Sequence, residues 1–165
     1  MSKEKYKWRV IYTKSRQEKK VAACLTEKGI KNYLPTIKTL KQWSDRKKMV
    51  EEVLFKSYVF VNLSEKEYYE ALKIPGAVKY VSIEGKAAII RNNQMETIIN
   101  TIENKLEFDI SNEHFAKGRI IKIASGPLKG TSGEVISRSG KKKLLVRINE
   151  IGYSLVVHLS PADIQ

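Results

Sequence analysis

The chain has 165 residues, a length that suits one medium domain or two small ones. Lysine and arginine number 31 against 18 aspartate and glutamate, and the net charge of +13 favours polyanionic partners, chiefly nucleic acid. The alternative is a lysine-rich surface that only keeps the protein in solution. A single cysteine, Cys24, excludes an internal disulfide. The polar start and the lack of an apolar run of ~20 residues predict a cytoplasmic protein without signal peptide or membrane span.

The first third of the chain alternates between strand and helix signals. Residues 8–13 predict a strand, and the capping-box pattern of Ser15 and Glu18 predicts a helix over 16–28. An extended segment over 30–40 contains Pro35, which predicts an edge strand or a bulge because proline lacks an N–H group.

A polar, basic loop over 42–48 then leads into an apolar run over 53–63, which predicts a central strand. Ser64 and Glu67 form a second capping box, which predicts another helix. Residues 78–83 predict a further strand. A third helix is predicted from Asn92 or Asn93, with an apolar stripe at helical spacing. The stripe comprises Met95, Ile98, Ile99, Ile102 and Leu106.

The last part of the chain changes character. Residues 108–117 break the periodicity and predict a linker, and strand signals follow over 119–124, 133–137, 144–148 and 153–159. The sequence therefore predicts an α+β protein in three parts. These are a sandwich over 6–107 with helices on a mostly antiparallel sheet, the linker, and a small SH3-like β-barrel over 118–165.

Catalytic motifs are missing from the sequence. Its two histidines, His114 and His158, fall in the predicted linker and a late strand, and no cysteine and histidine spacing suits a metal. We therefore expect no enzymatic activity, no cofactor and no metal.

Two groups of residues are candidates for nucleic-acid contact. Lys14, Arg16, Lys19 and Lys20 crowd the start of the first predicted helix, where the helix dipole already favours phosphate; the alternative is a solvated basic face. Trp43, Arg46 and Lys47 combine charge with an aromatic ring of the kind that can stack on an unpaired base. The alternative for Trp43 is packing at the tip of a hairpin.

The central strand presents aromatic side chains on alternate positions. Tyr58 and Phe60 share one face, while Phe55, Val59 and Val61 share the other. An uncovered face would be a docking surface, whereas burial of both faces would make the strand part of the core.

These segments together resemble the NusG family of transcription elongation factors. The resemblance rests on Lys7–Tyr12 as the opening strand, on Tyr33-Leu34-Pro35 in the second and on Leu54–Val61 as the signature strand. The tail resembles the family's KOW domain at Gly118, Gly126-Pro127, Gly130 and Gly133.

The resemblance implies an antitermination factor that binds the clamp of RNA polymerase and suppresses pausing. The residues that it assigns to polymerase binding are Tyr12, Phe55, Tyr58 and Phe60. It places Lys14 and Lys20 against non-template DNA. We expect non-template DNA or nascent RNA as the nucleic-acid partner. It assigns Leu128 and Ile151 to apolar contacts of the KOW domain with a ribosomal small-subunit protein or with Rho.

The sequence also departs from the family pattern. Lys56-Ser57 stands where Pro-Gly is usual, and Leu128 and Ile151 stand where phenylalanine is frequent. The short length, the basicity and the segment Gln42-Trp43-Ser44-Asp45-Arg46 resemble a specialised RfaH/UpxY-like paralogue that acts on particular operons. We expect the protein to be a monomer. The alternative function is a ribosome-associated or general RNA-binding KOW protein without polymerase contact.

Some RfaH-like proteins store the KOW domain as a helical hairpin, but this sequence predicts strands. Its β-branched residues are grouped in short runs, and glycines such as Gly126, Gly133 and Gly140 interrupt them. Each glycine within a helix would cost about 1 kcal/mol relative to alanine.

Overall fold

The computed structural model describes residues 5–164. Residues 1–4 and 165 lie outside that range. The expectation of no signal peptide rests on the polar start of the chain, most of which lies outside the described residues. The chain forms two compact units, Met1–Arg91 and Asn92–Gln165. Within residues 5–164, no helix combines the length and the apolar character that crossing a bilayer requires.

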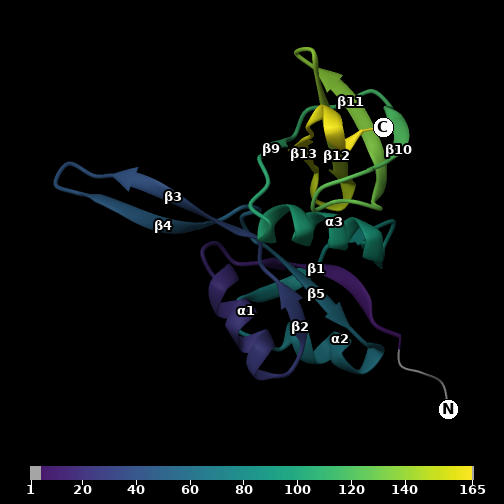
Figure 1. Ribbon diagram of the computed structural model, residues 1–165. Helices are drawn as coiled ribbons and strands as arrows, with labels where there is room; N and C mark the ends of the chain where they lie inside the picture. The colour runs from purple at the N-terminus through teal and green to yellow at the C-terminus, as the bar shows by residue number, and fades with distance from the viewer. Residues whose placement is uncertain (1–4, 165) are drawn as a thin grey trace. The chain divides into compact units, whose positions relative to one another are not determined.

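The first unit contains a four-stranded antiparallel sheet in the order β2-β5-β1-β6, with α1 and α2 on one of its faces (Figure 1). The strands of this sheet are β1 (Lys7–Thr13), β2 (Lys31–Tyr33), β5 (Tyr58–Leu63) and β6 (Ala77–Tyr80). Two separate hairpins consist of β3 (Thr36–Gln42) with β4 (Lys47–Val53), and β7 (Ser82–Ile83) with β8 (Lys86–Ala87). The helices are α1 (Glu18–Glu27) and α2 (Glu65–Leu72).

One hydrophobic cluster of the first unit lies between the sheet and these two helices. Ile11 of β1 stands opposite Val59 of β5, and both are fully buried. Val21 and Leu25 of α1 pack in the same cluster with Ala71 of α2. Alternate residues of the strands and one face of each helix point into this cluster, as expected where helices pack on a sheet.

The two predicted capping boxes had different outcomes. The Ser64 box is confirmed, because the Glu67 carboxylate accepts from the Ser64 backbone N–H at 3.1 Å. The Ser15 box is wrong: α1 starts after Gln17, with no side-chain cap. Arg16 has a φ of 62°, so the backbone turns there and Ser15 stands too far back to cap the helix.

Two predicted strands are each divided by a turn. The segment over 30–40 splits into β2 and β3 around Pro35, as its missing N–H group favours. The run over 53–63 contains a turn at residues 54–57, where Ser57 has a φ of 71°. The prediction that Phe55 lies in the central strand is therefore wrong, since hydrophobicity alone did not reveal the turn.

The second unit contains a five-stranded antiparallel sheet in the order β10-β11-β12-β13-β9 (Figure 1). Its elements are α3 (Asn92–Glu103), β9 (Phe108–Ser111), β10 (Arg119–Lys122), β11 (Ser132–Arg138), β12 (Lys141–Ile148) and β13 (Tyr153–His158). Two 3-10 turns, Asn149–Ile151 and Pro161–Asp163, complete it. Leu144, Ile148, Leu155 and Val157 are buried in its core.

Strand structure in the tail confirms the prediction against a helical hairpin. The turn between β11 and β12 consists of Ser139 and Gly140, with φ values of 53° and 75°. Positive φ at both central residues is the two-residue hairpin turn that matches the twist of antiparallel strands.

The second unit begins earlier along the chain than the predicted barrel. The side chain of Gln94 on α3 donates to the carbonyl of Arg147 on β12, so α3 belongs with this unit. The segment over 108–117 also contains β9, which pairs with β13 from Phe108 to Ser111. A strand of four residues is too short to produce a clear periodic signal, which explains why this segment reads as a linker.

Candidate functional site

Two tyrosines lie side by side at one end of the β1–β5 ladder. Tyr12 stands directly opposite Tyr58 in the register, and their ring centroids are 5.9 Å apart. Tyr12 is 38% exposed and Tyr58 is half-buried. Because cross-strand neighbours on one face of a sheet lie in contact, this pair forms a small aromatic surface.

The other two aromatic residues assigned to polymerase binding are buried. Phe60 is fully buried, and its ring contacts the buried ring of Phe55 edge-to-face at 6.1 Å. Both faces of β5 are therefore core at this point, since Val59 on the opposite face is also buried. The prediction that Tyr58 and Phe60 together form an exposed surface is wrong, because Phe60 is buried. Phe55 is buried as well and does not contribute to that surface.

The four cations at the start of α1 are all exposed. Glu18 stands among them in the chain, and its side chain is buried. Lys14, Arg16 and Lys20 leave their charges in solvent beside the helix N-terminus. Exposed cations beside a helix N-terminus are the arrangement that favours phosphate groups, through charge and helix dipole together.

Lys19 has a structural contact that the sequence did not reveal. Its ammonium group donates to the backbone carbonyl of Glu51 at 2.9 Å, which joins α1 to β4. The hairpin of β3 and β4 is thereby tied at its base to the helix that presents the other cations.

The hairpin of β3 and β4 ends in the predicted basic loop. The backbone N–H of Trp43 donates to the carbonyl of Arg46 at 2.8 Å and closes the turn. Trp43 is 45% exposed, and Arg46 and Lys47 beside it are exposed. The indole therefore has enough open surface for stacking, which favours the nucleic-acid interpretation over packing alone.

The structure buries both KOW residues that the resemblance assigns to partner contacts. Leu128 and Ile151 are 3% and 7% exposed. The prediction that they offer apolar contacts at the surface is therefore wrong. Both are aliphatic residues in turns between strands, where they close the core of this small sheet.

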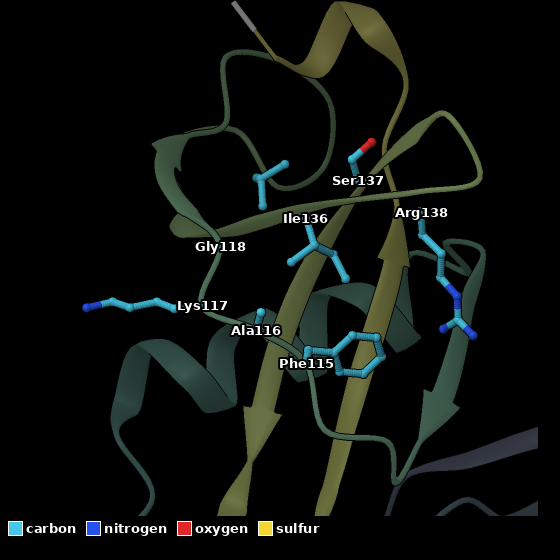
Figure 2. A pocket seen from close by; sticks show the side chains of 8 residues that line it. Phe115, Ala116, Lys117, Gly118, Ile136, Ser137 and Arg138 are labelled. Carbon is cyan, nitrogen blue, oxygen red and sulfur yellow. The ribbon is translucent and has the colours of Figure 1, made fainter.

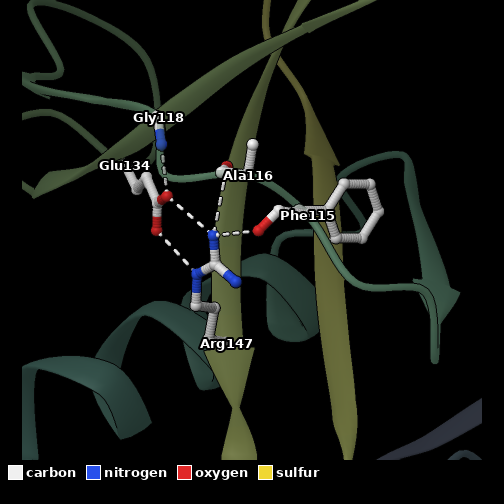
Figure 3. Close-up of polar contacts among 5 residues, drawn as sticks. All are labelled: Phe115, Ala116, Gly118, Glu134 and Arg147. Carbon is white, nitrogen blue, oxygen red and sulfur yellow. Dashed lines mark hydrogen bonds and ion pairs between the residues drawn. The ribbon is translucent and has the colours of Figure 1, made fainter.

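A polar cluster in the second unit was missed by the sequence analysis (Figure 3). Arg147 on β12 donates to both carboxylate oxygens of Glu134 on β11 and to the carbonyls of Phe115 and Ala116. The backbone N–H of Gly118 donates to Glu134 at 2.5 Å. Hydrogen bonds from Arg147 lower the pKa of Glu134, and those to Glu134 raise the pKa of Arg147. The cluster fastens residues 115–118 onto the sheet.

Neither the cluster nor the rest of residues 5–164 provides a metal site, because no group of three or more histidine, cysteine, aspartate or glutamate side chains converges there. His158 instead contacts the carboxylate of Asp109 at 3.0 Å, between the paired strands β13 and β9. The arrangement suits binding through surface charge and aromatic rings.

The two units define the protein as an α+β chain with a helix-covered sheet and a second antiparallel sheet. The family model described as "Transcription termination factor nusG" matches residues 6–99, which is more than half of the chain. The chain belongs to the NusG family of transcription termination and antitermination factors.

Individual relatives are distant. The "Transcription termination/antitermination protein NusG" of Chlamydia pneumoniae is 24% identical over 157 residues, which cover 87% of this chain and 86% of the relative. The structure titled "Domain interaction in Thermotoga maritima NusG" is 24% identical, with a TM-score of 0.48 over 98% of this chain and 97% of that one. The structure titled "Crystal Structure of MjSpt4:Spt5 complex conformation A" is 18% identical, with a TM-score of 0.30 over 93% and 88% of the two chains.

Proposed function

We propose that this protein binds RNA polymerase through its first unit and suppresses pausing or termination on particular operons. The observation that carries the proposal is the Tyr12–Tyr58 pair, which forms a partly exposed aromatic surface on the same unit as the exposed cations of α1. Aromatic residues with partial exposure are typical anchors of protein interfaces. Phe55 and Phe60 support this surface from the core.

The same unit is proposed to contact nucleic acid in the transcription complex. Lys14, Arg16 and Lys20 supply cations beside a helix N-terminus, and the hairpin tip supplies Trp43 with further cations. Non-template DNA and nascent RNA both offer phosphates and unpaired bases. Lys19 contributes to this surface by fixing the hairpin to α1.

The proposal is tested by co-purification with core RNA polymerase, followed by transcription in vitro through a pause site and a terminator. We expect the full chain to bind core polymerase and to shorten the pause, and the Tyr12→Ala, Tyr58→Ala double variant to lose both effects. Tyr69→Ala is the matched control, because Tyr69 is 70% exposed on α2 and lies outside the pair. Binding to RNA without binding to polymerase would instead support a general RNA-binding protein.

A further inference from the structure

The outer edge of β11 has a strand partner along only part of its length. β10 pairs with β11 from Ser132 to Val135, whereas the pairing of β11 with β12 continues to Arg138. Within residues 5–164, no strand pairs with Ile136, Ser137 or Arg138 on the side away from β12.

Ser137 directs its backbone N–H and carbonyl to this open side. The carbonyl oxygen of Val135 faces Gly118, since a Cβ built on Gly118 would lie 2.5 Å from that oxygen. Backbone groups of alternate residues in an antiparallel strand point to the same side, so the N–H and carbonyl of Ser137 point away from β12, as those of Val135 do. The two-residue turn agrees, because its closing pair, Arg138 and Lys141, is then the hydrogen-bonded pair with β12.

A pocket of about 380 Å³ lies beside this edge (Figure 2). The half-buried side chains of Phe115 and Ile136 give it an apolar lining. Its other wall is the segment over 115–118, which Arg147 and Glu134 hold in place. The pocket is therefore bounded by a fastened segment on one side and an incomplete sheet edge on the other.

The charge around the pocket is positive. Lys117 and Arg138 line it and are both exposed, while the nearby carboxylate of Glu134 is already paired with Arg147. Glu113 reaches Arg138 at 3.4 Å, although 60% of its side chain is exposed. The Glu113 carboxylate of the protein itself thus already pairs with Arg138, the cation that an acidic ligand would also use.

We propose that the β11 edge binds an extended, acidic segment of a partner protein, which adds to the sheet as a strand. The Ser137 backbone supplies one donor and one acceptor to the added strand, the pocket receives an apolar side chain, and Lys117 and Arg138 pair with flanking carboxylates. A peptide backbone matches this donor and acceptor pair, whereas a nucleotide has no repeating backbone amide. This site belongs to the second unit, whereas the residues proposed for polymerase and nucleic-acid contact belong to the first.

The proposal is tested on the full, isotope-labelled chain by nuclear magnetic resonance. The probe is a blocked heptapeptide with a Val-Thr-Val centre and two glutamates at each end. We expect amide shifts confined to the segment over 115–118 and to β11, and about tenfold slower amide exchange at Ser137 near saturation, because the bound strand protects that N–H. The same peptide with lysine in place of glutamate should not bind.

Variants separate the backbone and charge contributions. The Lys117→Gln, Arg138→Gln double variant should weaken binding about tenfold, which matches ~0.7 kcal/mol for each of two exposed charge pairs. Lys122→Gln with Lys129→Gln is the control for two charges lost elsewhere in the unit, because both lysines are exposed. Glu113→Gln should tighten binding about twofold to fivefold by freeing Arg138.

Ser137→Pro should abolish binding while β11 and β12 remain paired, since proline is tolerated where the N–H faces away from the sheet. If that variant fails to fold, amide exchange at Ser137 in the unaltered chain still decides the question. The proposal is overturned if the peptide leaves Ser137 exchange unchanged, if the lysine peptide binds equally well, or if a decauridine RNA shifts these amides and the acidic peptide does not.

Discussion

The guanidinium group of Arg147 holds both oxygens of the Glu134 carboxylate, with Nε to Oε2 and Nη2 to Oε1 each at 2.9 Å. Both side chains are mostly buried, with 27% and 13% of their surfaces exposed. The pair is a bidentate, charge-assisted contact between neighbouring strands, and the remaining hydrogen bonds of Arg147 go to the segment that precedes β10. The ion pair therefore joins β11 to β12, and the further hydrogen bonds of Arg147 attach the segment before β10 to both strands.

The first prediction concerns acid stability. The pKa of Glu134 is lowered in the folded state, so its contribution to stability is present above the ordinary value of 4.5 and is lost as pH falls through the lowered value. We expect Glu134→Gln to lower the free energy of unfolding by about 1–3 kcal/mol at neutral pH, because Arg147 loses a charged acceptor. Denaturant unfolding between about pH 3 and pH 7 should show the two proteins converging at low pH; a constant difference would contradict the role of the pair.

Gly118→Ala should destabilise the second unit by about 1–3 kcal/mol, because its Cβ meets backbone that cannot move aside. Thermal unfolding of the variant and of the unaltered chain measures the loss. An unchanged melting temperature would show that Gly118 is not required for the close approach to Val135.

Phe60→Ala and Tyr58→Ala should separate folding from docking. Phe60 is fully buried, so its loss should lower the free energy of unfolding by about 3–5 kcal/mol. Tyr58→Ala, at a half-buried position, should unfold nearly as the unaltered chain does while losing polymerase binding. The two measurements are denaturant unfolding and co-purification with core polymerase. Retained binding in a folded Tyr58→Ala protein would argue against the tyrosine pair as the docking surface.

Nucleic-acid contact at α1 predicts a change in salt dependence. The Lys14→Ala, Lys20→Ala double variant should reduce the slope of log affinity against log salt by roughly one to two on a bubble template, since each phosphate contact contributes ~0.9. Lys28→Ala with Lys86→Ala removes the same charge from exposed positions away from the start of α1. An unchanged slope in the first variant, or an equal change in the control, would exclude direct contact at Lys14 and Lys20.

We expect replacement of Arg16 by glycine to raise stability while it weakens nucleic-acid binding. A side chain at a φ of 62° is strained, and glycine removes that strain at some cost in chain entropy. We expect Arg16→Gly to raise the free energy of unfolding by about 0.5–1 kcal/mol and to weaken binding to a bubble template. Arg16→Ala removes the charge but keeps the strain, so it should weaken binding without the gain in stability. Equal stability of the two variants would contradict the strain at this position.

Local patterns in the sequence predicted the elements well where they were long or marked by a cap. The Ser64 capping box, the third helix and the four strands of the tail all formed, because hydrogen bonds between near neighbours and the grouping of β-branched residues determine them. Prediction failed at Ser15 and at the turn before Tyr58, where Arg16 and Ser57 adopt positive φ. Side chains of these types rarely adopt that conformation, so the sequence carries no signal for it.

Composition and motif order by themselves determined the α+β class, the family and the cationic start of α1. Only the tertiary structure decided which aromatic and apolar residues face solvent. Tyr12 and Tyr58 are accessible at the end of a ladder, whereas Phe60, Leu128 and Ile151 are buried, and a strand pattern does not say which of its faces is covered. The structure also decided the open edge at Ser137, because an unpaired backbone group depends on where a neighbouring strand ends and not on the residue that carries it.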